Sequence, residues 1–573
     1  MTKPLVFAGL AAVLLAGLTG TAAAGDYTPV TDARLTNPEP QNWLMTRGRY
    51  QGWSYSDLAQ VNAGNVKQLV PVWSFSTGVD SGHEAPPIVN NGIMFVSTPY
   101  SQVLALDAAS GDLLWRYKRP IPEGFSALHN TSRGVALYGD KVYFPTLDAT
   151  LVALDAKTGK VDWETKVEDW KTGYYMTMAP LIVKGKVMVG VSGGEFGVRG
   201  FVAAYDSETG KPVWKTYTVP APGEPGSDTW KKADTWKRGG ASTWMTGNYD
   251  PVTNTVFWGT GNASPWFGDQ RPGDNLYTSS TLALDPDTGK MKGHFQYHPN
   301  DSWDWDAMNA PMVIDYQKNG ATVTGLFTPA RNGYLYWLEH KNDGSISFVS
   351  ATAFVKQNVF KSINPETGRP DIDETHKPGT GKEASFCPSL WGGKDWPYEA
   401  YNPKTGMVYI PANDNHCGHM EGKVEPYIAG QWWTGVAIPD IGFTVDKNAA
   451  FYGEIQAWDV NQGKQEWRQT YAHSMMWGSL LTTAGDLVFG GGTNDRYFRA
   501  YDAKSGEPLW QFRTNSGIIA PPSTYEVNGV QYVAVQSGYG VDPAYQEGLL
   551  SNLLGWQKDI PQGGVIWVFA LSK

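Results

Sequence analysis

Two aspartates stand one residue apart in the stretch Trp303-Asp304-Trp305-Asp306. If the backbone is extended there, successive side chains alternate between two faces, so both carboxylates share one wall, about 7 Å apart, and both tryptophans share the other. The tryptophans indicate that this wall is buried, and a buried, unpaired carboxylate either takes up a proton or needs a cation. The stretch therefore predicts a cation site. Two solvated turn residues are the alternative interpretation.

A short sequence motif recurs along the chain and predicts the elements that must position these carboxylates. In each copy, apolar residues alternate before an Asp-x-x-Thr/Ser-Gly turn, and a second alternating run ends in tryptophan. The strong copies end at Trp115, Trp163, Trp214, Trp467 and Trp510. Alternation on both sides of a turn predicts a β-hairpin, with the tryptophan packed between neighbouring sheets. The first three strong copies lie 48 and 51 residues apart and the last two lie 43 apart, and such periods indicate a repeated structural unit.

Four strands in each repeat make one blade of a β-propeller, and 573 residues hold about eight such blades. A helical solenoid is the alternative, which the strand-like alternation and glycine-rich turns disfavour. We therefore expect an all-β, eight-bladed propeller as one domain, residues 25–573, with its working residues in loops around the central channel. Long segments outside the repeat predict loops over one end of that channel: 218–240, 262–280, 355–400 and 415–455. Within them, 357–384 is expected to be surface-exposed.

Composition and charge limit the class of protein. The chain contains 25 tryptophans and 65 glycines, and only 18% of its residues are charged. Such a chain is rich in aromatic residues and turn formers rather than helix formers. Its formal net charge is −10 and it has no basic run, which argues against nucleic acid as a partner.

The first residues predict export. Lys3 precedes an uncharged apolar stretch that ends in the small residues Ala22, Ala23 and Ala24, a pattern typical of a secretory signal peptide over residues 1–24. An uncleaved membrane anchor is the alternative. No later stretch is long and apolar enough to cross a bilayer, so the mature chain is expected to have no membrane span.

The chain has two cysteines, Cys387 and Cys417. In an exported protein, an even pair predicts a disulfide, here closing a loop of about thirty residues and contributing about 3 to 4 kcal/mol. Zinc ligation by these cysteines with His416 and His419 is the alternative. No Cys-x-x-Cys-His motif occurs, which argues against a covalently attached c-type haem.

Several longer motifs occur together in this chain: SGGEFGVRG, GTGNASPW, WDWDAMN, RNGYLYWL and CPSLWGGKDWPYEAYNPKTGMVYIP. With these motifs in this order, nearly the whole mature chain resembles the pyrroloquinoline-quinone (PQQ) dependent alcohol dehydrogenases of the methanol and ethanol dehydrogenase type. The resemblance implies an eight-bladed propeller that holds PQQ in its channel and oxidises a small alcohol to an aldehyde in the periplasm.

The resemblance also implies a set of cofactor-binding residues. Trp244 would be the flat floor on which the flat quinone stacks. The polar rim of PQQ would be bound by residues at matching motif positions: Glu84, Arg133, Thr177, Ser192, Gly193, Gly194, Ser242, Arg331, Asp395 and Trp477.

A metal ion beside the quinone is implied too, held by Glu195, Asn262 and Asp304. These three residues offer oxygen, which selects a hard cation over zinc or copper. Calcium-dependent members usually carry a small uncharged residue two positions after the aspartate, whereas lanthanide-dependent members carry a carboxylate, as Asp306 does here. A lanthanide is therefore expected, with calcium as the alternative, because a more highly charged cation offsets more of the repulsion among buried carboxylates.

In the implied reaction, Asp304 is the general base that takes the alcohol's hydroxyl proton, and Arg331 stabilises negative charge on the quinone. Because the chain has no haem motif, the electron acceptor is expected to be a separate soluble cytochrome c. Most family members carry two adjacent cysteines against the other face of PQQ. Here the matching residues are Ala127 and Leu128, so we expect PQQ binding with an altered lid.

Other functions are left open by the sequence. A non-catalytic propeller scaffold would share the tryptophan-docked repeats but would not need the carboxylates, and a glycan-binding propeller would explain the aromatic residues alone. The choice of alcohol is not readable, although Trp266, Phe267 and the run GQWWTGVAIPDIGF are candidates for the pocket wall. The subunit number is equally open, with a homodimer among the options.

Overall fold

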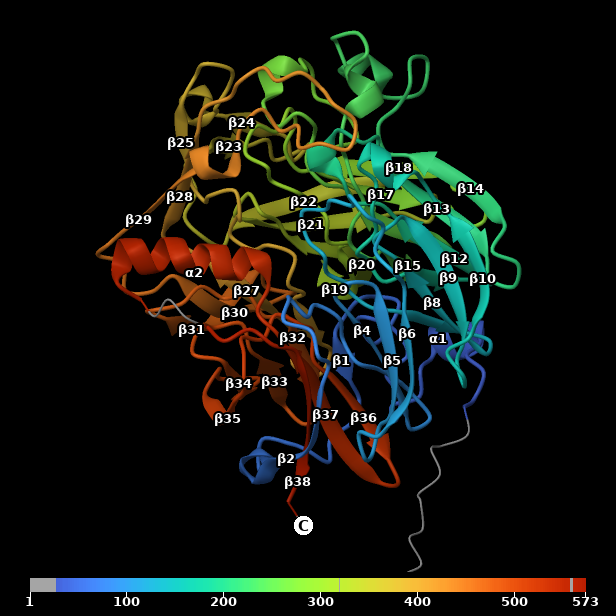
Figure 1. The fold of residues 1–573 in the computed structure, drawn as a ribbon. Coiled ribbons are helices and arrows are strands. Elements are labelled where there is room, and N and C mark those ends of the chain that lie inside the picture. The colour runs from blue at the N-terminus through green and yellow to red at the C-terminus, as the bar shows by residue number, and fades with distance from the viewer. Residues whose placement is uncertain (1–26, 319, 557–559, 573) are drawn as a thin grey trace, which may run out of the picture.

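The computed structural model describes residues 27–318, 320–556 and 560–572, so the predicted signal peptide, residues 1–24, lies outside the described residues. Within them, seven four-stranded sheets and one five-stranded sheet follow one another along the chain. Figure 1 shows them arranged around the molecule from β3 to β38. The β-propeller prediction is thereby confirmed. The number of blades stays a prediction, because it depends on counting each large sheet as one blade.

Most of the large sheets are antiparallel meanders of four consecutive strands. The first three are β3 (Ile88–Asn90), β4 (Ile93–Thr98), β5 (Gln102–Asp107) and β6 (Leu113–Lys118); β7 (Ala136–Tyr138), β8 (Lys141–Pro145), β9 (Thr150–Asp155) and β10 (Val161–Lys166); and β11 (Leu181–Val183), β12 (Lys186–Gly190), β13 (Phe201–Asp206) and β14 (Pro212–Tyr217). The next two are β15 (Asn248–Asp250), β16 (Thr255–Gly259), β17 (Ser280–Leu284) and β18 (Met291–Gln296); and β19 (Met312–Lys318), β20 (Ala321–Pro329), β21 (Tyr334–His340) and β22 (Ile346–Ala353).

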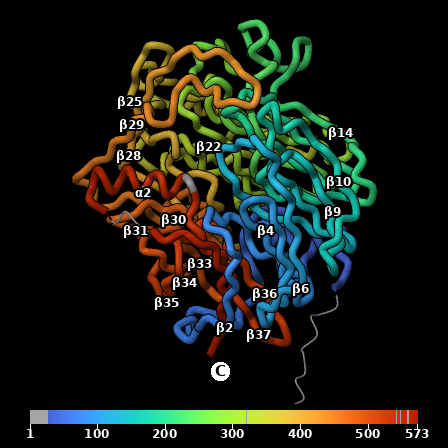
Figure 2. Tube along the Cα trace, viewed as in Figure 1, coloured from blue at the N-terminus to red at the C-terminus, as the bar shows by residue number. Residues whose placement is uncertain are grey.

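The last three large sheets depart from this simple order. One contains β26 (Ala400–Asn402), β27 (Met407–Asn413), β30 (Gly453–Asp459) and β31 (Lys464–Tyr471). The five-stranded sheet contains β32 (Leu480–Thr483), β33 (Leu487–Gly490), β34 (Tyr497–Asp502), β35 (Pro508–Arg513) and the short parallel β1 (Tyr55–Ser56). The final sheet joins β36 (Ser523–Val527), β37 (Val530–Ser537) and β38 (Val565–Leu571) to β2 (Leu69–Ser76). Pairing of β2 with β38 closes the ring. Both strands lie near the C-terminus in Figure 1, and Figure 2 shows β2 and β37 close together there.

The repeat tryptophans dock each sheet onto the next. The indole Nε1 of Trp115, on β6, donates to the carbonyl of Ala156 at 2.9 Å, and Trp510, on β35, donates to the carbonyl of Leu69 at 2.9 Å. For four of these indoles, Trp115, Trp163, Trp214 and Trp467, the turn glycine of the next repeat packs against the ring: a Cβ added at Gly159, whose φ is +69°, would lie 2.5 Å from the Trp115 ring. The Asp-x-x-Thr/Ser-Gly turn therefore needs glycine both for its left-handed backbone and for this contact.

The segments predicted as loops carry short elements of their own. They include the strands β23 (Phe360–Ile363), β24 (Pro370–Ile372), β25 (Ala384–Phe386), β28 (His416–Met420) and β29 (Gly442–Val445). The 3₁₀ helices of the chain are η1 (Val66–Gln68), η2 (Trp170–Thr172), η3 (Gly194–Phe196), η4 (Ser227–Thr229), η5 (Thr235–Arg238), η6 (Gly268–Gln270), η7 (Glu374–His376) and η8 (Ile438–Asp440). In Figure 1, β23, β24 and β25 lie at the opposite end of the molecule from β2 and β38.

Two α-helices are present in the described chain, α1 (Asp32–Thr36) and α2 (Val541–Leu554). The sequence interpretation did not include α2, which is inserted between β37 and β38 and lies on the outside of the sheets in Figure 1. No helix among the described residues is both long and apolar enough to cross a membrane.

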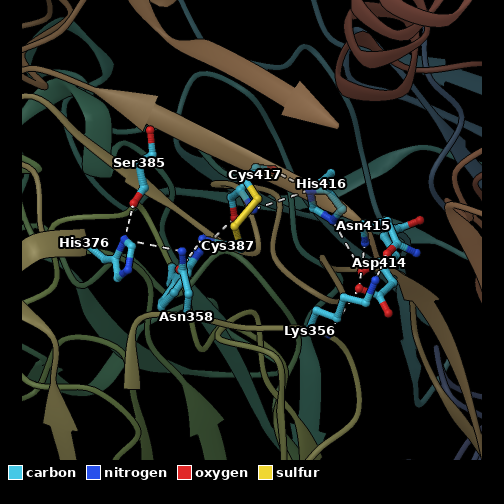
Figure 3. Close-up of a disulfide and its surroundings, with 12 residues drawn as sticks. Lys356, Asn358, His376, Ser385, Cys387, Asp414, Asn415, His416 and Cys417 are labelled. Carbon is cyan, nitrogen blue, oxygen red and sulfur yellow. Dashed lines mark hydrogen bonds between the residues drawn. A yellow bond between two sulfur atoms is a disulfide. The ribbon is translucent and has the colours of Figure 1, made fainter. Parts of the chain in front are cut away.

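Cys387 and Cys417 form the predicted disulfide, which joins the chain after β25 to β28 (Figure 3). The zinc alternative is wrong, because both sulfur atoms are engaged in this bond. His416, beside it, contacts the Ser389 hydroxyl through Nδ1 at 2.9 Å, so it takes part in the local hydrogen bonding instead.

Candidate active site

A cavity of about 1170 Å³, measured out to its mouth, opens beneath α2 and the segment 432–443. Ten of the residues predicted from motifs scattered along the sequence line it together: Arg133, Thr177, Ser192, Gly193, Glu195, Trp244, Asp304, Asp306, Arg331 and Asp395. The fold thus gathers most of the predicted site into one hollow.

The remaining predicted residues do not line the cavity directly. Glu84 lies behind Arg133, and its Oε2 forms an ion pair with Nη2 of Arg133 at 2.7 Å. Ser242 and Asn262 lie behind Gly194, where an added Cβ would be 3.0 Å from Asn262 Oδ1 and 3.2 Å from Ser242 Oγ. Trp477 is buried, and its indole N–H donates to Gln546 of α2.

The Trp303-Asp304-Trp305-Asp306 stretch is not an extended strand, which corrects the premise of the first prediction. It is an irregular loop in which Asp304 has a φ of +63°. The alternation of faces nevertheless holds. Trp303 and Trp305 stack with ring centroids 5.1 Å apart on the protein side, while Asp304 and Asp306 line the cavity.

Arg331 lies among three buried carboxylates. Its Nη2 is 2.7 Å from Oδ1 of Asp395, and its guanidinium nitrogens are 3.8 Å from carboxylate oxygens of both Asp304 and Asp306. Its Nη1 also donates to the main-chain carbonyl of Asp304 at 2.9 Å. Asp395 therefore holds the guanidinium where it faces the other two carboxylates.

Trp244 is tied to the same cluster. Its Nε1 donates to Oδ2 of Asp306 at 2.9 Å, and the backbone N–H of Asn262 donates to the other oxygen of that carboxylate. The Arg133 guanidinium lies 4.6 Å from the centroid of the Trp244 ring and donates to the Thr177 hydroxyl at 2.6 Å. The Arg133 guanidinium therefore lies over the flat face of Trp244 in the cavity.

The carboxylates outnumber the cations, and their pKa values reflect this. Burial, followed by repulsion from Asp306, raises the pKa of Glu195 to about 7 and that of Asp304 well above its usual range. Burial also raises the pKa of Asp306, and that of Asp395 to about 6. Each of these groups resists ionisation, because burial takes its charged form out of water and Arg331 offsets only part of that cost.

Glu195, Asp304 and Asp306 share the cavity wall without forming a closed group. Across the part of the chain that the structure describes, no set of three or more His, Cys, Asp or Glu side chains has the spacing of a metal site. An ion bound here would therefore have to draw these carboxylates closer and use another kind of oxygen, such as the Asn262 amide.

Comparison with known proteins identifies the family. The model of the PQQ family, glucose/ethanol/alcohol dehydrogenase β-propeller domain, matches residues 43–367 and 443–533. The chain belongs to this family of PQQ-dependent alcohol dehydrogenases. Quinoprotein alcohol dehydrogenase PedH of Pseudomonas putida is 39% identical to it, over 98% of this chain and 96% of PedH. Quinoprotein ethanol dehydrogenase of Pseudomonas aeruginosa is 37% identical, over 98% and 96% respectively.

A solved structure agrees with this assignment. Europium-containing methanol dehydrogenase superposes on this alcohol dehydrogenase with a TM-score of 0.87 at 35% identity, covering 94% of this chain and 100% of that one. The predicted family and enzyme class, a quinoprotein oxidoreductase acting on alcohols, are thereby confirmed.

The alcohol dehydrogenase also has cavity residues that the sequence interpretation missed. Helix α2 contributes Asp542, Tyr545 and Leu549 to the lining, and Asp542 Oδ2 is 3.3 Å from Nε2 of His129. The one available signal was the interruption of the hairpin between VQSGYG and GGVIWVFAL. That interruption indicates an insertion but not where the insertion folds.

Some of the residues predicted to form the pocket wall line the cavity, and others do not. Trp266 lines the cavity, whereas Phe267 is buried behind it. The run GQWWTGVAIPDIGF supplies four apolar side chains: Trp432, Ile438, Ile441 and Phe443. Of the two residues expected to form an altered lid, Leu128 lines the cavity and Ala127 packs in the same small apolar cluster.

Proposed function

We propose that this alcohol dehydrogenase oxidises primary alcohols to aldehydes in the periplasm, using PQQ and a lanthanide ion, and passes the electrons to a separate soluble cytochrome c. The observation that carries the metal assignment is Asp306, a third carboxylate in the cavity wall beside Glu195 and Asp304. Glu195, Asp304 and Asp306 together favour a trivalent ion over a divalent one, because the larger charge offsets more of their mutual repulsion.

The donor set fits such an ion. Asn262 Oδ1 is buried and has no hydrogen-bond partner among the described residues, which is unusual for a buried amide oxygen. Glu195, Asp304 and Asp306 add carboxylate oxygens, and an all-oxygen set is what hard cations bind. Asp306 can keep its two hydrogen bonds and still ligate, since each carboxylate oxygen has two lone pairs.

The residues around Trp244 fit a flat, anionic quinone. The indole offers a stacking surface, and Arg133 offers a charged donor for a carboxylate. The hydroxyls of Thr177 and Ser192, 3.2 Å from each other, offer further hydrogen bonds at the same wall. Glu84 would orient Arg133 through their ion pair.

Bound PQQ supplies the electron-accepting quinone, and the bound metal supplies a Lewis acid. Asp304 takes the hydroxyl proton of the alcohol, which requires the carboxylate to be ionised. Its raised pKa in the metal-free protein means that a neighbouring cation is needed to bring the carboxylate into that form. Arg331, fixed by Asp395, stabilises the negative charge that develops during the reaction.

The electron acceptor follows from two features of the sequence. The absence of a Cys-x-x-Cys-His motif favours a separate cytochrome c over an attached haem. The net charge of −10 favours a basic patch on that partner, so electron transfer should weaken as salt is added.

The proposal is tested by reconstituting the metal-free mature protein with PQQ and measuring dye-linked oxidation of ethanol with lanthanum or with calcium. Activity with lanthanum alone is the expected result. Activity with calcium alone would keep the dehydrogenase but remove the lanthanide assignment. A folded protein that binds no quinone and is inactive with both ions would point to a non-catalytic scaffold.

A further inference from the structure

The backbone at Asp304 adopts a left-handed conformation. Its φ of +63° lies in the left-handed region, where residues other than glycine are uncommon. A residue other than glycine persists in this conformation only when its surroundings fix it. The groups that fix this peptide therefore decide where the Asp304 carboxylate points.

Asp301 holds the peptide from one side. Its carboxylate is fully buried, and its Oδ2 accepts the backbone N–H of Asp304 at 3.2 Å. Its Oδ1 accepts the N–H groups of Trp305 at 3.2 Å and Trp303 at 3.4 Å. From the other side, Arg331 donates to the Asp304 carbonyl at 2.9 Å. Both polar groups of the Asp304 main chain are thus engaged.

His298 links this loop to the arginine loop. Its Nε2 lies 2.7 Å from the Trp305 carbonyl and 3.3 Å from Oδ1 of Asp301. Its Nδ1 is 3.4 Å from the side-chain amide nitrogen, Nδ2, of Asn332, the residue after Arg331. All of these groups are buried, and neither His298 nor Asp301 lines the cavity.

We propose that Asp301 is a positioning residue, which sets the Asp304 carboxylate for proton abstraction without itself contacting the substrate. This inference deepens the proposed function and rests on it. A carboxylate that swings by about 1 Å loses its alignment with the hydroxyl proton, an error that costs about 100-fold in rate.

Asp301→Asn isolates the contact. An asparagine oxygen can keep the two N–H groups of Trp303 and Trp305, which leaves its amide NH₂ facing the N–H of Asp304, donor against donor. The reversed orientation would set the NH₂ against two backbone donors, so it is disfavoured. Asp155→Asn is the matched control. The Asp155 carboxylate also accepts backbone N–H groups, those of Lys157 and Thr158 at 3.2 and 2.8 Å, but in a surface turn distant in sequence from Asp301.

The measurements are kcat and KM for ethanol in the PQQ- and lanthanum-loaded enzyme, together with PQQ affinity by absorbance titration. We expect Asp301→Asn to lower kcat by about 100-fold while KM and PQQ affinity change less than about threefold, and Asp155→Asn to match the wild type. His298→Gln keeps a donor for the Trp305 carbonyl but loses the ring against Asp301, and it should lower kcat by about tenfold. This second variant tests the proposal if Asp301→Asn does not fold.

Two outcomes would overturn the inference. A folded Asp301→Asn enzyme with wild-type kcat would show that the contact does not position the base. A loss of kcat that merely follows a loss of bound PQQ would make Asp301 a structural residue of the cofactor site. A wild-type enzyme that oxidises no alcohol with either metal would instead sink the proposed function, and the inference with it.

Discussion

Trp244 and Asp306 are joined by a hydrogen bond of 2.9 Å from the indole Nε1 to Oδ2. The side chain proposed as the floor for the quinone is thus attached directly to the carboxylate proposed to select the metal. The other oxygen of Asp306 accepts the backbone N–H of Asn262, a further proposed ligand. A change at Asp306 therefore reaches both cofactors unless it keeps these hydrogen bonds.

Asp306→Asn and Asp306→Ala separate the two roles. The asparagine oxygen can still accept one of the two N–H groups, but the negative charge is gone, so lanthanum-supported activity should fall by about 100-fold or more. Alanine removes both acceptors and should also weaken PQQ binding. The measurements are alcohol oxidation with lanthanum and PQQ affinity for each variant. Full lanthanum activity in Asp306→Asn would remove Asp306 from the metal site.

The propeller could be predicted because its determinants are local and repeated. Trp115 and Trp510 belong to copies of one motif, and each indole finds its carbonyl partner on the next sheet. For Trp115, the matching turn of the next repeat also supplies the glycine against which the indole packs. Because each copy of the motif makes the same indole-to-carbonyl contact, the motif can be recognised from the sequence alone.

The conformation of the site was less predictable, because distant groups determine it. Asp304 has a left-handed φ in a loop rather than an extended strand, because Asp301 holds its backbone N–H and Arg331 holds its carbonyl. The alternation of residue types along the sequence carries no information on these contacts. Helix α2 was missed for a similar reason. Its contribution to the cavity comes from packing over a hollow built by other segments, which its own sequence does not reveal.

The apolar part of the cavity wall contributed by the segment 432–443 predicts a preference for longer alcohols. Each methylene buried against Ile438, Ile441 and their neighbours should raise kcat/KM by about fourfold, from ethanol to 1-hexanol. Ile441→Ala should lower kcat/KM for 1-hexanol by about five- to tenfold and leave methanol unaffected. Ile428→Ala is the control, since Ile428 lies in the same segment but is 51% exposed and outside the cavity lining. Equal kcat/KM for all alcohols in the wild type would contradict the prediction.

Glu454 predicts a pH dependence of stability away from the active site. Burial raises its pKa from 4.5 to about 7, although Gln456 donates to it at 2.7 Å. The folded state therefore binds this proton more tightly than the unfolded state does, so the free energy of unfolding falls as pH rises from about 4.5 to about 7. The loss is at most about 3 kcal/mol.

Glu454→Gln should abolish this contribution while keeping a side chain of similar shape. Because other buried carboxylates also titrate, the informative quantity is the difference between variant and wild type in urea unfolding at pH 5 and pH 8. We expect the variant to gain stability relative to the wild type at pH 8 but not at pH 5. An identical difference at both pH values would argue against a buried, protonated Glu454.

The disulfide between Cys387 and Cys417 should stabilise the fold and the cavity wall together. It closes a separation of 30 residues, for which chain entropy predicts about 3 to 4 kcal/mol. The closed segment includes Ser389, whose carbonyl accepts the Trp305 indole N–H at 2.9 Å, and Asp395, which holds Arg331. Replacing both cysteines by serine should therefore lower the denaturant midpoint and also reduce kcat.

Reduction supplies the control for that variant. Dithiothreitol should lower the denaturant midpoint of the wild type to that of the double serine variant and leave the variant itself unchanged. A wild type that keeps its midpoint after its thiols have been shown to be reduced would mean that the surrounding strands, β25 and β28, hold the segment without the bond. The cavity wall would then owe its position to the β25–β28 ladder, which pairs Phe386 with Gly418 next to the bridge.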